Sequence, residues 1–169
     1  MAQDAALLTG ELTLTPPARR QSEWHITDPE GPAGHVIPPG RGAGHVRLHG
    51  MGFDIAFGQL DDGGRAILRP WRLTIEGANL FHAWSMPGEG WFNRILARDH
   101  PLYTLHDHRP PLRMILRGGL NRQIALLAGD DLLALADYPR SRGPRHIRHA
   151  PTLPPAVQAA LCHAVTQPR

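Results

Sequence analysis

Four closely spaced arginines near the C-terminus are the residues best suited to bind a ligand. The segment 138–169 contains no Asp or Glu, and its basic run comprises Arg140, Arg142, Arg145 and Arg148. A guanidinium presents a planar fork of N–H donors that matches the paired oxygens of phosphate or carboxylate groups. This run therefore predicts an anion-binding surface, although a Gly/Pro-kinked, solvated loop leading into the next element explains the same residues.

The charge distribution favours an anionic partner but does not name it. Residues 1–100 contain nine arginines and eleven acidic residues, whereas residues 101–169 contain nine arginines and four acidic residues. A membrane surface, a nucleic acid or an acidic ligand fits this basic third of the chain. Nucleic acid fits less well, because Tyr138 is the sole aromatic residue beside the run and single-strand binding normally uses stacking aromatics. All 18 basic residues are arginine, as a GC-rich genome would also produce.

His106 and His108 form the pattern closest to a metal site. On a strand, residues two apart share a face, so both imidazoles could bind one ion while Asp107 points the other way. Two ligands are too few, and a third would have to come through the fold from His49, His82 or His100. Since the chain has 11 histidines, a chance pair is expected. A metal-binding barrel enzyme is therefore the rival hypothesis to a binding module.

Other catalytic patterns are absent from the sequence. None of the three serines lies in Gly-x-Ser-x-Gly, and the glycine-rich residues 40–44 lack the Lys-Ser/Thr of a phosphate-binding loop. The lone cysteine, Cys162, falls in an apolar segment where a thiol packs as a small hydrophobic group. We therefore predict a non-enzymatic binding module without a cofactor.

The elements that must position these residues are predominantly short strands. Alternating apolar residues separated by Gly, Pro and Asp-Gly turns predict strands, and the turn at residues 61–64 is a strong hairpin pattern. The tetrapeptide Ala-Gly-His-Val occurs at 33–36 and again at 43–46, as expected for successive hairpin arms. The predicted strands span residues 11–15, 22–27, 34–37, 45–49, 53–57, 65–68, 71–75, 80–85, 91–97, 102–106, 112–117 and 123–128.

Residues 132–136 fit two structures. As a strand they pair with residues 124–128 across a Gly-Asp turn; as a helix they are capped by Asp130 or Asp131. The similar composition on both sides of the turn favours the hairpin.

A helix is predicted over residues 152–166. Pro154 and Pro155 suit a first turn, and Thr152 is a candidate N-cap. Apolar residues cover nearly all of its surface, which is typical of a buried helix. We expect it inside a barrel or clamped between sheets.

The fold class is thus mainly β, an antiparallel meander closing into a barrel or curved sandwich around one buried C-terminal helix. We expect a single domain, 1–169, with strands over 7–137, a basic loop over 138–151 and the helix over 152–166. The N-terminus lacks the basic and apolar regions of a signal peptide, and no apolar run is long enough to span a bilayer. These features predict a cytoplasmic protein, with peripheral membrane binding as an alternative. The physiological ligand and oligomeric state do not follow from the sequence.

The strand-and-turn texture of residues 7–166 resembles the tubby C-terminal-like superfamily, which includes phospholipid scramblases and LURP-one-related proteins. The resemblance rests on Trp24-His-Ile-Thr-Asp-Pro-Glu-Gly31, on Gln59-Leu-Asp-Asp-Gly-Gly-Arg65 and on Arg122-Gln-Ile-Ala-Leu126. It implies a meander around a central helix and a binding role at lipid headgroups. The calcium loop and cysteine-rich motif of scramblases are missing, and the Lys/Arg pair of tubby domains cannot be placed, because this chain has no lysine.

Overall fold

The structure is a computed structural model that describes residues 8–19, 21–38, 44–57, 71–75, 78–83, 86–87, 97–104, 112–117, 123–137 and 143–166. Thirteen strands and one helix lie in these ranges. The strands are β1 (Gly10–Thr15), β2 (Trp24–Asp28), β3 (Gly31–Ile37), β4 (Gly44–Leu48), β5 (Met51–Phe57), β6 (Trp71–Ile75), β7 (Ala78–Ala83), β8 (Met86–Pro87), β9 (Ala97–Thr104), β10 (Leu112–Arg117), β11 (Gln123–Ala128), β12 (Asp131–Asp137) and β13 (Arg145–His149); the helix is α2 (Pro155–Thr166).

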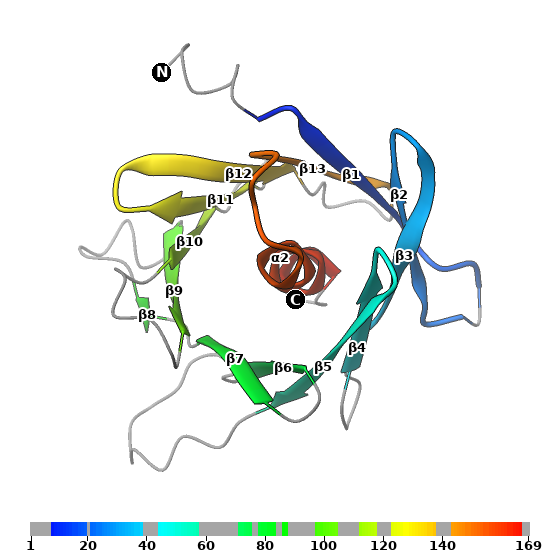
Figure 1. The fold of residues 1–169 in the computed structure, drawn as a ribbon, viewed down its shortest axis with the longest axis horizontal. Coiled ribbons are helices and arrows are strands. Elements are labelled where there is room, and N and C mark those ends of the chain that lie inside the picture. The colour runs from blue at the N-terminus through cyan, green and yellow to red at the C-terminus, as the bar shows by residue number, and fades with distance from the viewer. Residues whose placement is uncertain are drawn as a thin grey trace.

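The strands form one antiparallel sheet that wraps around α2 (Figure 1). Apart from β8, which pairs with β9 and not with β7, neighbours in the chain are neighbours in the sheet, and β13 returns to pair with β1. Strand β9 pairs with β10 along one edge and with β7 and β8 along the other. The pairings therefore continue around the helix. The mainly β fold with one C-terminal helix, predicted from the sequence, is confirmed for the described residues.

Most predicted strands coincide with observed ones. Residues 112–117 and 123–128 have the predicted bounds, and residues 131–137 form the strand of a hairpin with β11, as preferred over a helix. The described residues of the repeat, 33–36 and 44–46, lie on adjacent strands, where Val36 is directly opposite Val46. The turn at 61–64 and the predicted strands at 65–68 and 91–96 lie outside the described residues.

Side-chain alternation along each strand explains the buried core. Leu12 and Leu14 of β1 are buried, and so are Val46 and Leu48 of β4, whereas the residues between them are more exposed. Successive side chains of a strand point to opposite faces of the sheet. The apolar residues therefore face the helix and the polar residues form the outer wall.

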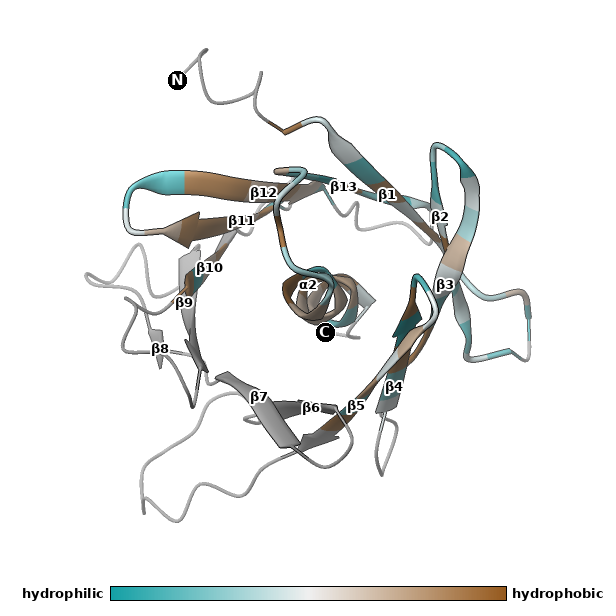
Figure 2. Ribbon diagram, viewed as in Figure 1, coloured by the Kyte–Doolittle hydropathy of each residue, from teal (hydrophilic) through white to brown (hydrophobic). Residues whose placement is uncertain are grey.

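Figure 2 shows the helix inside the ring of strands, and residues Val157 to His163 are all buried. Its contacts are mainly with β3, β4 and β5. It begins three residues later than predicted: the carbonyl of Pro154 accepts hydrogen bonds from the N–H groups of Val157 (3.0 Å) and Gln158 (3.1 Å). Thr152 is exposed in the preceding turn and does not cap the helix. Pro155, which lacks an N–H, takes the first helical position.

The predicted basic loop over 138–151 is wrong for residues 145–149, which form β13 between β12 and β1. Here Ile147 and His149 point inward and are buried, while His146 and Arg148 point outward. The alternation was hidden because Ile147 is the sole apolar residue in the strand. Backbone pairing with β1 on one side and with β12 on the other holds this polar segment in the sheet.

The two ends of the barrel differ in how the strands are joined. At one end, which we call the turn end, two-residue connections follow Asp28, Leu48, Ile75 and Ala128, residues 105–111 join β9 to β10, and residues 150–154 lead from β13 into α2. At the other, the loop end, every connection is at least five residues long. The loop-end connections span residues 16–23, 38–43, 58–70, 84–96 (including β8), 118–122 and 138–144.

Candidate functional site

Arginine is concentrated in the connections of one end. The loop-end connections contain nine arginines and four acidic residues. Those of the turn end, residues 29–30, 49–50, 76–77, 105–111, 129–130 and 150–154, contain one arginine and four acidic residues. Half of all arginines in the chain thus fall in connections that begin and end at the loop end, which makes this end the candidate anion-binding surface.

Arg145 anchors the base of the predicted arginine run. It begins β13 at the loop end, and its guanidinium carbon lies 4.4 Å from the ring centroid of Trp24, which begins β2. Trp24 is buried, with 8% of its surface exposed, and Arg145 is half-buried. A cation stacked on an aromatic face is stabilised by the ring quadrupole. Sequence reasoning missed Trp24 as a partner, since the two residues are 121 positions apart.

Arg148 belongs to a different surface. It is exposed on the outer wall, directly opposite Glu11 of β1 and Leu135 of β12. A carboxylate on the neighbouring strand lowers the local positive potential. The structure therefore separates Arg145 and Arg148, which the sequence had grouped in one anion-binding run. Arg140 and Arg142 lie outside the described residues, in the connection that enters β13 at the loop end.

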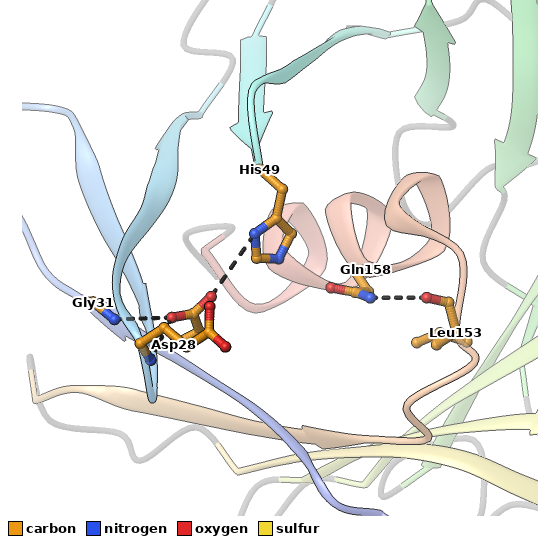
Figure 3. A network of polar contacts seen from close by, with 6 residues as sticks. Asp28, Gly31, His49, Leu153 and Gln158 are labelled. Carbon is orange, nitrogen blue, oxygen red and sulfur yellow. Dashed lines mark hydrogen bonds and ion pairs between the residues drawn. The ribbon is translucent and has the colours of Figure 1, made fainter.

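At the turn end, Figure 3 shows two sets of polar contacts, one between Asp28 and its neighbours and one at the start of the helix. The Oδ1 atom of Asp28 accepts hydrogen bonds from the N–H groups of Glu30 (2.8 Å) and Gly31 (3.0 Å). Its Oδ2 atom lies 3.8 Å from Nδ1 of His49. From the helix, Gln158 donates from Nε2 to the carbonyl of Leu153 (2.8 Å). These contacts of Asp28, His49 and Gln158 were not predicted from the sequence. Gln158 is the one available hint, because it is a polar residue in an otherwise apolar part of the helix.

A second group of polar residues lies on the outer wall of β3–β5. The rings of His35 and His45 have centroids 6.2 Å apart, and their Nδ1 atoms approach Glu23 (3.5 Å) and Asp54 (2.9 Å) respectively. Within the described ranges, no three His, Cys, Asp or Glu side chains are arranged to hold a metal ion. His106 and His108 are outside these ranges, so the metal hypothesis stays a prediction.

The two titratable residues of the helix core are held in their neutral forms. Burial raises the pKa of the Cys162 thiol to about 12 and lowers the pKa of the His163 imidazole to about 3. A thiol with this pKa is protonated at neutral pH, and the thiolate is the nucleophilic species. Cys162 therefore acts as core packing, as the sequence predicted.

Comparison with known proteins assigns no family. No family model matches the chain, and neither the curated proteins nor the solved structures contain a significant match. The resemblance to the tubby C-terminal-like superfamily accordingly stays a prediction. None of the described residues form a helix long and apolar enough to cross a membrane.

Proposed function

We propose that this protein is a non-enzymatic, tubby-like binding module whose loop end recognises an anionic partner, with anionic lipid headgroups as the partner class. The observation that carries the proposal is the unequal distribution of arginine between the two ends of the barrel. Nine arginines and four acidic residues occupy the loop-end connections, against one arginine and four acidic residues at the turn end.

The distribution of these arginines favours a broad anionic surface over a single bound ion. Two of the nine lie in the connection at 138–144, and the other seven are spread over the five remaining loop-end connections. A bilayer containing anionic lipids presents many headgroups in one plane, and each basic residue near it contributes about 1 kcal/mol. The protein would then bind as a peripheral protein with its loop end toward the membrane.

Arg145 gives this surface a fixed point among the described residues. Its stacking on buried Trp24 ties the start of β13, and hence the end of the 138–144 connection, to the barrel. Less conformational freedom is lost on binding when a charged segment is anchored in this way. The proposal therefore assigns headgroup contact to Arg140 and Arg142, anchoring to Arg145, and a place on the outer wall to Arg148.

Co-sedimentation with vesicles of phosphatidylcholine, with and without phosphatidylserine, tests the proposal. We expect binding only to the vesicles that contain phosphatidylserine, and we expect added salt to weaken it through screening. Replacing both Arg140 and Arg142 by Gln removes about 2 kcal/mol, which corresponds to roughly 30-fold weaker binding.

The matched control is the Arg47→Gln/Arg148→Gln double variant, which removes the same charge from exposed positions on the outer wall. We expect its binding to change by less than about threefold, because distant charges are screened. Equal losses in the two double variants would show a response to net charge alone. Absence of binding at low salt would refute the lipid proposal.

A further inference from the structure

The outer wall of the barrel changes character at strands β10–β12. On β1, β2 and β4, the side chains that alternate with the buried ones are Glu, Thr, His and Arg. On β10–β12, the corresponding positions hold five partly exposed apolar residues, namely Ile115, Ala125, Leu127, Leu132 and Leu135. Figure 2 shows the result as nearly continuous brown along β11 and β12. We call these five residues the outer apolar patch.

The strand register makes the outer apolar patch contiguous. Ile115 is directly opposite Ala125, which is directly opposite Leu135, and Leu127 is directly opposite Leu132. Residues that face each other across neighbouring strands of a sheet are in contact on one face. Strands that are apolar on both faces are typical of sheets covered on both sides, and a contiguous apolar patch on a surface marks a contact site.

A row of polar positions beside the patch shows what covers it. Arg117 of β10 is directly opposite Gln123 of β11, which is directly opposite Asp137 of β12. Gln123 donates from Nε2 to Oδ1 of Asp137 (2.9 Å), which fixes the carboxylate beside β11. The row therefore runs from a cationic position through an amide to a carboxylate, with β11 in the middle. Such a row is complementary in charge to a second copy of itself turned by half a rotation.

One two-fold axis satisfies both the apolar and the charged positions. If the axis is parallel to β11, β10 of each copy lies over β12 of the other. Position 117 of one copy then meets Asp137 of the other, twice, and Ile115 meets Leu135. An axis perpendicular to the strands would instead lay β10 over β10 in reverse and bring positions 113 and 117, both arginine, together. Like charges so placed oppose association.

We propose that the outer wall of β10–β12 is the interface of a symmetric homodimer whose two-fold axis is parallel to β11. In this dimer Ala125 lies on the axis opposite its own copy, and its small side chain lets the two sheets pack at the usual separation of about 10 Å. Symmetric dimers of this kind are the commonest oligomers of a single chain. The axis also leaves both loop ends on the same side, although the dimer does not rest on the proposed lipid binding.

The size of the face sets the strength that we expect. Three strands about 4.8 Å apart, each with six residues at about 3.4 Å, give a face of roughly 300 Å². A standard stable complex buries about 800 Å² per partner, so this dimer should dissociate on dilution. Sedimentation velocity of the full chain, from low micromolar to near-millimolar concentration, should show a monomer that converts to a dimer.

Ala125→Glu tests the position on the axis, because it places two carboxylates against each other. We expect dimerisation about tenfold weaker or more. The matched control is Thr13→Glu, which introduces the same charge at a partly exposed outer position of β1 and should leave dimerisation unchanged. Melting curves of both variants verify folding.

Exchange of charges tests the register itself. Arg117→Asp alone gives two pairs of facing carboxylates in the dimer, and Asp137→Arg alone gives two pairs of facing guanidiniums. Each single variant should therefore dimerise about tenfold more weakly or worse. An equimolar mixture of the two variants restores two opposite-charge pairs, so it should form a heterodimer.

Three results would overturn the dimer: a chain that stays monomeric throughout the concentration range, equal weakening by Ala125→Glu and Thr13→Glu, or a mixture of the two charge variants that dimerises no better than either alone. Vesicle binding at low protein concentration, where the chain is monomeric, is measured separately. Failure of the dimer therefore leaves the loop-end proposal standing, and failure of the loop-end proposal leaves the dimer standing.

Discussion

The two ends of this barrel differ in the length and conformation of their connections and in their arginine content. Four of the turn-end connections are two residues long, and two of these have constrained backbones: His49 and Gly50 have positive φ angles of 48° and 81°, and Gly129 has a φ of 60°. Two-residue hairpins of this kind match the twist of the strands they join. The loop end has connections of five residues or more, and it carries most of the arginines outside the strands.

This difference predicts which property of the protein a substitution at each end should alter. At the turn end, backbone conformation limits which residues fit, so substitutions should alter stability. At the loop end, charge is the dominant feature, so substitutions should alter binding. The predictions below test this separation, beginning with the change that should affect both ends together.

The largest effect is expected from the helix that the two ends share. Leu161 is fully buried, and Leu161→Ala should lower the free energy of unfolding by about 2–5 kcal/mol through lost contacts and a cavity. Urea denaturation measures it, with exposed Glu11→Ala as the control that should stay within about 0.5 kcal/mol. If hydrogen exchange of Leu161→Ala increased in the strand residues of one end alone, the two ends would not be joined through one core.

Lowering the pH should also destabilise the core, and this effect is expected to be common to both ends of the barrel. The pKa of His163 is about 3 in the folded chain against 6.5 when exposed, so the unfolded chain binds the proton more tightly. Stability is therefore full above pH 6.5 and falls as the pH drops toward 3, by about 2 kcal/mol between roughly pH 8 and pH 5. Urea denaturation at the two pH values measures this loss.

The His163→Leu variant should remove this part of the pH dependence. His25→Gln is the control, because His25 is exposed on β2 and should leave the dependence in place. An unchanged pH dependence in His163→Leu would assign the acid sensitivity to other groups.

The Gly129→Ala variant should change stability without changing vesicle binding, and it therefore tests the difference between the two ends. A Cβ at this position meets no atom within 4 Å, so its effect is conformational, from the φ of 60°. We expect a loss of about 1–2 kcal/mol in unfolding free energy, the cost of the left-handed conformation for a residue with a Cβ. Vesicle binding should be unchanged. Weaker vesicle binding by the folded variant would place part of the anion site at the turn end.

The smallest effect is expected at Arg145, which we propose anchors the 138–144 connection without contacting headgroups. Arg145→Met keeps an apolar side chain over Trp24 but removes the cation, and should cost about 0.5–2 kcal/mol of stability. Denaturation followed by tryptophan fluorescence measures it. Its vesicle binding should fall less than that of Arg140→Gln/Arg142→Gln. A larger fall would make Arg145 a direct headgroup contact.

The fold was more predictable than the sites, for physical reasons. Strands such as β10 and β11 have alternating apolar residues and glycine near their bounds, so local pattern suffices. Strand β13 was missed because sheet pairing, rather than its own sequence, makes it a strand. The helix start was placed too early because Thr152 has the side chain of a cap, whereas the carbonyl of Pro154 does the capping.

The arrangement of sites depends on pairings across the whole chain. Asp28, His49 and Gln158 come from two hairpins and the C-terminal helix, and no local spacing relates them. Likewise Arg145 reaches Trp24 because both β13 and β2 pair with β1. The arginine run itself was visible in the sequence, but its division between the loop end and the outer wall required the strand register.

Hydrogen exchange of the protein bound to vesicles containing phosphatidylserine tests the central claim most directly. The account predicts that binding protects peptides covering the loop-end connections at 16–23, 38–43 and 138–144, and leaves the turns at 28–31, 49–50 and 129–130 unchanged. Protection of those turns, or of the outer wall around Arg47 and Arg148, with no change at the loop end would contradict it.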